Sequence, residues 1–169
     1  MPVFDGSMAT SFAPYLDPSQ PEALQIVAIC IVDDAIEFGG AGAHRYIPQV
    51  VPIFLRNLSS QNVVLRQCSA YGIAQVIRLA PEFIASQLGT VIQSLLAIVN
   101  AADAGDEDNE GATENGYFAL GSIISNSVLC ASSAPAAGTN WGSHTPAQLG
   151  AVWLKGLPFK CDGINNVTP

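Results

Sequence analysis

Carboxylates are the side chains of this sequence that could most directly do chemistry. Asp33 and Glu37 lie four residues apart, a spacing that places both on one face of a helix, where general acid–base catalysis could use them. Such catalysis also requires a cleft and two carboxyl groups with different pKa values. The two histidines, His44 and His144, stand far apart, and no nucleophile-elbow, dinucleotide-binding or phosphate-loop motif occurs. We therefore expect a protein that is not an enzyme and that uses no cofactor.

A second group of carboxylates forms a run that no cation interrupts. Its members are Asp103, Asp106, Glu107, Asp108 and Glu110. Their spacing lacks the ligand order and the central glycine of an EF-hand, so we expect no calcium and predict no other metal site. The run predicts an acidic loop, which serves either to keep the protein soluble or to attract a basic partner. Attraction of a basic partner would weaken as the salt concentration rises.

The charges of the chain are few and strongly unequal in sign. Its 169 residues carry a formal net charge of −8, with 14 Asp and Glu against 6 Lys and Arg, while 49% of the residues are hydrophobic and only 12% are charged. An apolar content of this size excludes an intrinsically disordered chain. Six cations are too few for a protein that neutralises phosphates, so we expect no nucleic-acid partner. The length suits a single domain.

The cysteines and the N-terminus indicate in which cellular compartment the protein is expected. No two of Cys30, Cys68, Cys130 and Cys161 have the spacing of a zinc knuckle or a redox CxxC pair, so we expect buried, reduced thiols in a cytosolic protein. The N-terminus has neither the basic residues nor the apolar core of a signal peptide. The longest apolar run, residues 26–32, is too short to span a bilayer, so we expect no membrane partner.

An internal repeat organises the chain. Shifting the sequence by 41 residues aligns the apolar positions of 35–58 with those of 76–99, and a shift of 47 aligns 72–77 with 119–124. Within 88–99 the apolar residues recur at intervals of three and four, which is the pattern of an amphipathic helix. A repeat of about 40–47 residues with two helices is typical of HEAT or armadillo solenoids.

We therefore predict an all-α fold, an α-α superhelix of the HEAT/armadillo-like solenoid type with about three helix pairs. Gly39 and Pro81 follow predicted helix ends, and Asn62 can cap a helix start. Pro48 and Pro52 each remove a backbone donor, so they predict a late start or a kink in the second helix. The predicted helices span 22–38, 44–58, 62–79, 82–100, 111–130 and 146–156.

The whole chain is expected to divide into three parts. Residues 1–21 are expected to be the remnant of a preceding repeat. Residues 22–160 hold the repeats, with a flexible insert at 132–144 that is rich in Ala, Ser, Gly and Thr. Residues 161–169 are expected to be a disordered tail.

The helical period predicts which groups share an exposed face. Short side chains such as Ser69 and Gly72 indicate that the helices stack closely, and Arg66 is expected to play a structural role by bridging to the turn of a neighbouring repeat. Carboxylates on the exposed face would attract Lys and Arg of a partner, and aromatic rings would pack against their stems. Solvation alone is the alternative for the acids, and packing between helices is the alternative for the rings. The face is expected to carry Asp33, Asp34, Glu37, Gln67, Tyr71, Arg78, Glu114, Phe118 and Ser122.

Four stretches carry a resemblance to a known family. They are 30–37 (CIVDDAIE), 62–73 (NVVLRQCSAYGI), 112–115 (ATEN) and 153–158 (WLKGLP). In this order and at these separations they resemble the C-terminal HEAT repeats of the beta-3 class of karyopherin-β nuclear import receptors. The resemblance covers roughly residues 12–130 and 146–160.

The resemblance implies a segment of a nuclear transport receptor that binds basic cargo proteins on the concave side of its solenoid. It further implies partners among the phenylalanine-glycine nucleoporins and a location in the cytoplasm and nucleus. The small GTPase Ran binds mainly to N-terminal repeats of the family, which this chain lacks. The expected cargo-binding residues are Asp33, Asp34, Glu37, Gln67, Tyr71, Glu114 and Phe118.

Two other hypotheses stay open. The chain could be a HEAT-repeat interaction scaffold without a role in transport. It could also be a non-functional truncated fragment, because members of the family are several times longer, and the cut ends of a solenoid expose apolar surfaces that neighbouring repeats normally cover.

Overall fold

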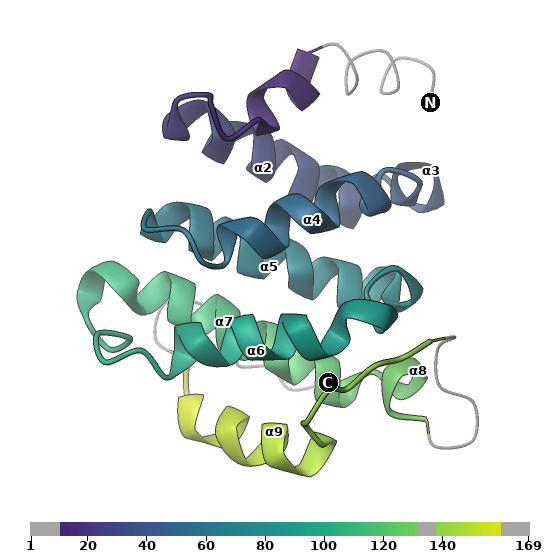
Figure 1. Ribbon diagram of the computed structural model, residues 1–169, viewed down its shortest axis with the longest axis vertical. Coiled ribbons are helices and arrows are strands. Elements are labelled where there is room, and N and C mark those ends of the chain that lie inside the picture. Colours follow the sequence, from purple (N-terminus) through teal and green to yellow (C-terminus); the bar gives the residue numbers. More distant parts are fainter. Residues whose placement is uncertain (1–10, 132–137, 160–169) are drawn as a thin grey trace.

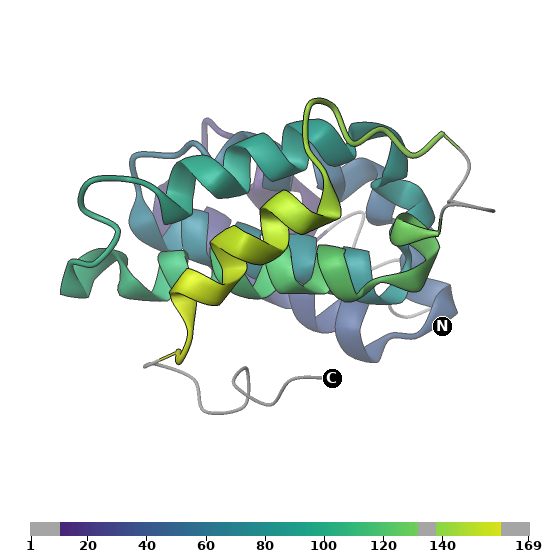
Figure 2. The same ribbon diagram turned by 90° about the horizontal axis from the view of Figure 1, so that it is seen from below.

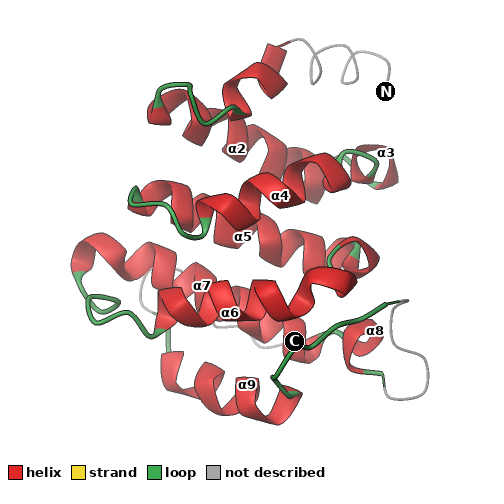
Figure 3. Cartoon of the chain, viewed as in Figure 1, coloured by secondary structure: helices red, strands yellow, loops and turns green. Residues whose placement is uncertain are grey.

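A computed structural model describes residues 11–131 and 138–159. Within these residues the chain forms helices and loops and no strand (Figure 3). The predicted all-α solenoid is thereby confirmed. The α-helices are α2 (Glu22–Phe38), α3 (Ala41–His44), α4 (Ile47–Asn57), α5 (Val63–Leu79), α6 (Leu88–Val99), α7 (Glu107–Ser125), α8 (Ser127–Cys130) and α9 (Pro146–Trp153). The 3-10 helices are η2 (Ala13–Leu16), η3 (Pro81–Phe83), η4 (Ala85–Gln87) and η5 (Leu154–Gly156).

The helices stack in two layers (Figure 1). One layer holds α4 and α6, and the other holds the long helices α2, α5 and α7, of which α5 packs between its two neighbours. Each helix of the first layer also packs against the second, α4 on α5 and α6 on α7. The short helix α9 crosses the end of the stack and packs on α7 (Figure 2). The middle helix α5 and the last long helix α7 each pack against at least three other helices.

Helix starts and interruptions follow from local side-chain chemistry. The carboxamide of Asn62 accepts hydrogen bonds from the backbone N–H groups of Val64 and Leu65, at 3.0 and 3.2 Å, and so caps the start of α5. The second predicted helix starts late, at Ile47, with Pro48 in its first turn, where its missing donor is harmless. Pro52 lies inside the same helix.

The helix predicted at 111–130 is wrong at both ends. It begins earlier, at the acidic run, because carboxylates are favourable in the first turn of a helix, near its positive dipole end. It also ends at Ser125, since Asn126 takes an extended conformation and caps the short helix α8 through bonds to two backbone N–H groups. The carboxamide of Asn126 also donates to the backbone oxygen of Ile77 at 2.8 Å, which fixes the interruption against α5.

One core runs through both layers and is built mainly of aliphatic side chains. Each large side chain that is buried completely stabilises the fold by about 1.5–3 kcal/mol. Gly72 lies where three helices meet, with Asp33 of α2 and Phe54 of α4 against its Cα. No side chain fits at this position, so a glycine is required where the three helices meet. The largest fully buried side chains include Ile29, Ile36, Phe54, Ile73, Ile77, Leu88, Ile92, Leu95 and Leu120.

The predicted peripheral segments are described only in part. Residues 1–10, the whole of the predicted tail at 161–169 and the first part of the insert lie outside the described residues. The later part of the insert is held against η4 and α6 by two backbone hydrogen bonds. The N–H of Asn140 donates to the oxygen of Ala85, and the oxygen of Asn140 accepts from the N–H of Gly89. These bonds are 2.8 and 2.7 Å long. Among the described helices, none has both the length and the apolar character that crossing a membrane requires.

Candidate functional site

The exposed side of α2, α5 and α7, which we call the three-helix face, brings together residues from three successive repeats. These helices run parallel, since Glu22 bonds to Asn62 near their starts and Glu37 bonds to Tyr71 further along. The same register continues to the third helix, where Asn115 donates to the backbone oxygen of Gln67 at 3.0 Å. The face is therefore built from the same side of three successive parallel helices.

Glu37, Tyr71 and Phe118 form a continuous row across this face. The Tyr71 hydroxyl donates to Oε2 of Glu37 at 2.6 Å, and its ring stacks on that of Phe118 with centroids 6.4 Å apart and planes 26° apart. Burial raises the pKa of Tyr71 to about 12, and the bond to Glu37 and the charge of Glu37 act in the same direction. The hydroxyl therefore stays a donor at physiological pH.

The aromatic end of this row already holds a cation. The guanidinium carbon of Arg78 lies 5.7 Å from the centre of the Phe118 ring, within the range of a cation–π contact. A side-chain nitrogen of Arg78 also donates to Gln75 at 3.2 Å. The rings of Tyr71 and Phe118 pack against each other between α5 and α7, and both keep part of their surface open.

Asp33 does not lie on the exposed face, so its predicted exposure is wrong. Only 4% of its surface is accessible, and within the described residues its Oδ1 has no hydrogen-bond partner. Burial raises the pKa of Asp33 well above its usual value, and the charges of Asp34 and Glu37 raise it further. Of the three α2 carboxylates expected on this face, only Asp34 is exposed, and Glu37 is half-buried.

Glu114 is a second wrong prediction of exposure. It is 8% exposed, because α7 is packed by α5, α6 and α9 and so buries more than one side. Its carboxylate is not placed to meet a partner on the surface. Gln67, by contrast, remains partly exposed on α5, and its side chain lies against Gly111 of α7.

The acidic run is not a loop as predicted, since most of it is helical. Asp106 occupies the position before α7, and Glu107, Asp108 and Glu110 fall in its first turn, while Asp103 lies in the turn before it. All except the half-buried Glu110 are exposed. The helix dipole partly compensates their charge, yet they still form the most acidic exposed segment of the described chain.

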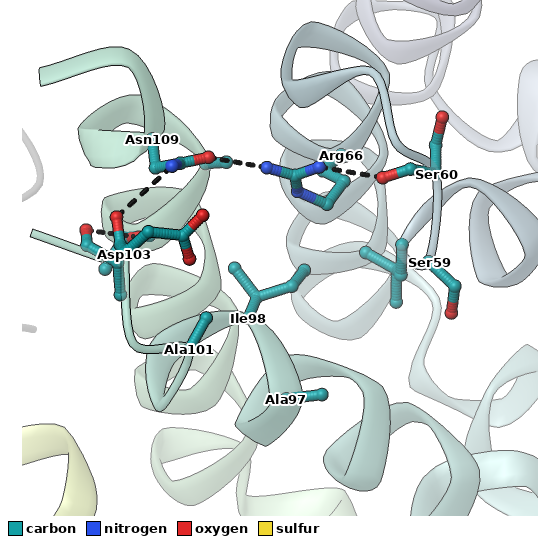
Figure 4. A pocket seen from close by; sticks show the side chains of 12 residues that line it. Ser59, Ser60, Arg66, Ala97, Ile98, Ala101, Asp103 and Asn109 are labelled. Carbon is teal, nitrogen blue, oxygen red and sulfur yellow. Dashed lines mark hydrogen bonds between the residues drawn. The ribbon is translucent and has the colours of Figure 1, made fainter. Parts of the chain in front are cut away.

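Arg66 joins the second repeat to the third beside this acidic segment (Figure 4). Its guanidinium donates to the backbone oxygens of Ser60 and Gln61 at 2.7 and 3.2 Å, and to Oδ1 of Asn109 at 2.6 Å. Asn109 in turn donates to the backbone oxygen of Asp103 at 3.2 Å. One side chain thus ties the turn of its own repeat to the start of α7.

A pocket of about 300 Å³ opens at this junction (Figure 4). Its apolar wall comes from Leu58, Ile98 and neighbouring alanines, and its polar rim from Ser59, Arg66 and Asp103. Because the guanidinium of Arg66 is already engaged by three acceptors, the pocket has no free cation aimed into it. We assign it a structural origin, the hollow between two repeat turns.

Two features of the three-helix face were not found from the sequence. Cys30 and Cys68 lie side by side with their sulfurs 3.6 Å apart, and Arg78 is held over Phe118. The sequence did carry a signal for the thiol pair, because a separation of 38 residues is one helical turn short of the 41-residue repeat. Parallel helices one repeat apart bring such positions close together.

The described residues contain no group of three or more His, Cys, Asp or Glu side chains that could hold a metal ion. The acidic segment at the start of α7 is spread along a helix rather than gathered around a point. The geometry of this surface therefore offers charge and aromatic contact, and it can act by non-covalent recognition of another molecule.

Comparison with known proteins bears on what that molecule is. No family model matches the chain. The chain is similar to a protein of Dictyostelium discoideum described as a probable importin-5 homolog, with 28% identity over 139 residues. This match covers 80% of the chain and 12% of the relative, so the chain spans a small part of that protein's length. The match supports a karyopherin-like relationship and does not distinguish the beta-3 class within it.

Proposed function

We propose that this chain is a segment of a nuclear transport receptor and that it binds basic cargo proteins through the three-helix face. The similarity to a probable importin-5 homolog supports the first part, and the stack of repeated helix pairs agrees with it. Recognition in such a segment is non-covalent, so the proposal involves no reaction and no cofactor. The location that follows from it is the cytoplasm and the nucleus.

The observation that carries the cargo proposal is the pairing of exposed carboxylates with a row of aromatic rings. Asp34 and Glu37 supply negative charge on α2, and the partly open rings of Tyr71 and Phe118 continue the same face. A lysine or arginine side chain suits such a surface, because its head pairs with carboxylates while its stem packs on rings. Phe38, which is 76% exposed, adds a further apolar contact at the end of α2.

The contact between Arg78 and Phe118 supports this chemistry from within the chain. It holds a guanidinium over a ring of the three-helix face, which is how an arginine of a cargo would be held over Tyr71. The exposed carboxylates at the start of α7 act at longer range. Together with the net charge of −8 they raise the local concentration of basic segments before contact.

Binding of a lysine- and arginine-rich peptide to the full 169-residue chain tests the proposal. Fluorescence anisotropy at low and at physiological salt should show affinity that falls steeply with ionic strength. Asp34→Lys reverses a charge on the three-helix face and should weaken binding about threefold or more at low salt. The matched control is Glu82→Lys, which makes the same charge change at an exposed position in η3.

The control should change the affinity less than twofold. Equal losses from both variants would mean that the peptide responds to net charge alone and that the three-helix face is not its site. Absence of binding at low salt would refute the cargo proposal for this segment. It would leave an interaction scaffold or a non-functional fragment as the better interpretation.

A second binding experiment separates a transport receptor from a scaffold. The receptor proposal expects weak binding of phenylalanine-glycine nucleoporin repeats, whose rings need apolar hollows between helices. A peptide with serine in place of each phenylalanine is the control. Equal signals from the two peptides would contradict this part of the proposal. Binding of the small GTPase Ran is not expected of this segment by itself.

A further inference from the structure

Two cysteines from successive repeats meet on the three-helix face. The sulfur of Cys30 on α2 lies 3.6 Å from that of Cys68 on α5, and both are free thiols. Cys30 is exposed and Cys68 is half-buried, so a small molecule can reach the first sulfur and the second lies directly behind it. Neither thiol is needed for the proposed contacts with a cargo.

Side-chain hydrogen bonds join α2 to α5 on both sides of this thiol pair. A side-chain nitrogen of Asn62 donates to Glu22 at 2.7 Å before the pair, and the Tyr71 hydroxyl donates to Glu37 at 2.6 Å beyond it. Gly72 allows the two helices to approach closely. A disulfide holds its sulfurs about 2.0 Å apart, so closure requires the two sulfurs to approach from their present separation of 3.6 Å.

We propose that Cys30 and Cys68 are a modification site, at which exchange with a low-molecular-weight disulfide such as oxidised glutathione forms a reversible disulfide between the first two repeats. The thiolate of Cys30 attacks one sulfur of oxidised glutathione, and one glutathione thiolate leaves. Cys68 then loses its proton to water and its sulfur attacks that of Cys30, which releases the second glutathione. Two electrons pass from the two cysteines to the glutathione disulfide, and every sulfur is accounted for.

The two thiols have different roles in this sequence. Cys30 is the attacking group, because it is the exposed one. Cys68 is the resolving group: burial raises its pKa to about 12, and the neighbouring Cys30 and the charge of Asp33 act in the same direction. Cys68 therefore stays protonated while Cys30 reacts, and it attacks only after the mixed disulfide has formed on Cys30. The resulting link fixes α2 to α5 and does not depend on the proposal that cargo binds nearby.

Mass spectrometry of the full chain tests this proposal. The parent protein carries Cys161→Ser, because Cys161 lies outside the described residues, and so retains three of the four cysteines. After reduction and treatment with oxidised glutathione, the expected product has lost two hydrogen atoms and keeps one free thiol. Proteolytic peptides that contain Cys30 and Cys68 should be joined, and dithiothreitol should separate them.

Two variants make the assignment specific. Cys130→Ser should still form the link, because the Cys130 sulfur lies against the backbone oxygens of Ile123 and Ile124, at 3.4 and 3.5 Å, and away from the pair. Cys68→Ser should stop at a stable glutathione adduct on Cys30. A stable adduct on Cys30 in the parent protein would overturn the proposal. So would a link that contains Cys130 or that joins two chains.

Discussion

Replacing Gly72 with alanine should destabilise the protein, although alanine favours helices more than glycine does. A methyl group at this position would lie 2.6 and 2.9 Å from two ring carbons of Phe54 and would also meet the carboxylate of Asp33. Neither neighbour can move away easily, since Phe54 is 1% exposed and Asp33 is 4% exposed. The helices α2 and α4 must therefore both shift away from α5.

The size of the effect follows from two opposing terms. Overpacking a close-packed core costs about 1–3 kcal/mol, and contacts on two sides put this site in the upper half of that range. Exchanging glycine for alanine within a helix contributes about 1 kcal/mol in the opposite direction. The free energy of unfolding should therefore fall by about 1–2 kcal/mol, which corresponds to a thermal midpoint lower by roughly 2–8 °C for a chain of this length.

The matched control is Gly150→Ala in α9, where an added methyl group meets nothing within 4 Å. This variant should gain stability by up to about 1 kcal/mol, from helix propensity alone. Urea denaturation followed by circular dichroism measures both variants in the same way, and an unchanged dependence on urea shows that the denatured state is the same. The two substitutions are chemically identical, so only the surroundings distinguish them.

A double-variant cycle identifies the contact responsible. Asp33→Ala removes one of the two obstacles, so Gly72→Ala should cost at least about 1 kcal/mol less in that background. Stabilisation by Gly72→Ala equal to that of Gly150→Ala would refute the inferred close approach of the three helices. An unchanged cost in the Asp33→Ala background would assign the obstruction to Phe54 alone.

Two further predictions concern buried and bridging polar groups. Because the pKa of Asp33 is raised in the folded state, the folded protein keeps a proton that the unfolded chain loses near the ordinary aspartate pKa of 3.8. Stability should therefore fall as pH rises above about 4 and level off above the raised pKa. Asp33→Asn should flatten this decline in urea titrations repeated across pH, and an equal decline in both proteins would contradict the assignment. Arg66→Ala removes the bonds to Ser60 and Asn109 and should lower the free energy of unfolding by about 1–3 kcal/mol. Arg66→Lys keeps the charge but not the two-nitrogen geometry, so it should recover only part of the loss, and full recovery would mean that the guanidinium geometry is unimportant.

The sequence predicted the helix pairs well because apolar residues repeat along the chain with the helical period. It also predicted a late start or a kink in the second helix from the missing proline donors, and the helix does start late, at Ile47. The helix boundary at Ser125 could not be predicted in this way. It depends on the bond between Asn126 and the backbone of Ile77, which lies 49 residues earlier in the chain.

The candidate site was predicted less completely, for a related reason. On an isolated α2 the helical period places Asp33 at the edge between the buried and exposed sides, and only the approach of Gly72 decides which side it takes. Glu114 is buried because α5, α6 and α9 pack on several sides of α7, which the helical period of α7 alone does not predict. Periodicity describes one helix, whereas burial is a property of the whole stack.

Gly72 thus accounts for several features of the three-helix face that otherwise have no common origin. The close approach that it permits between α2 and α5 buries the Asp33 carboxylate, and the same approach brings the thiols of Cys30 and Cys68 together. It also brings the Tyr71 hydroxyl within 2.6 Å of Glu37. A substitution that moves these helices apart must therefore lower the stability and slow the closure of the disulfide together. If Gly72→Ala lowered the stability without slowing that closure, the thiol pair would owe its geometry to local side-chain freedom and not to the spacing of the repeats.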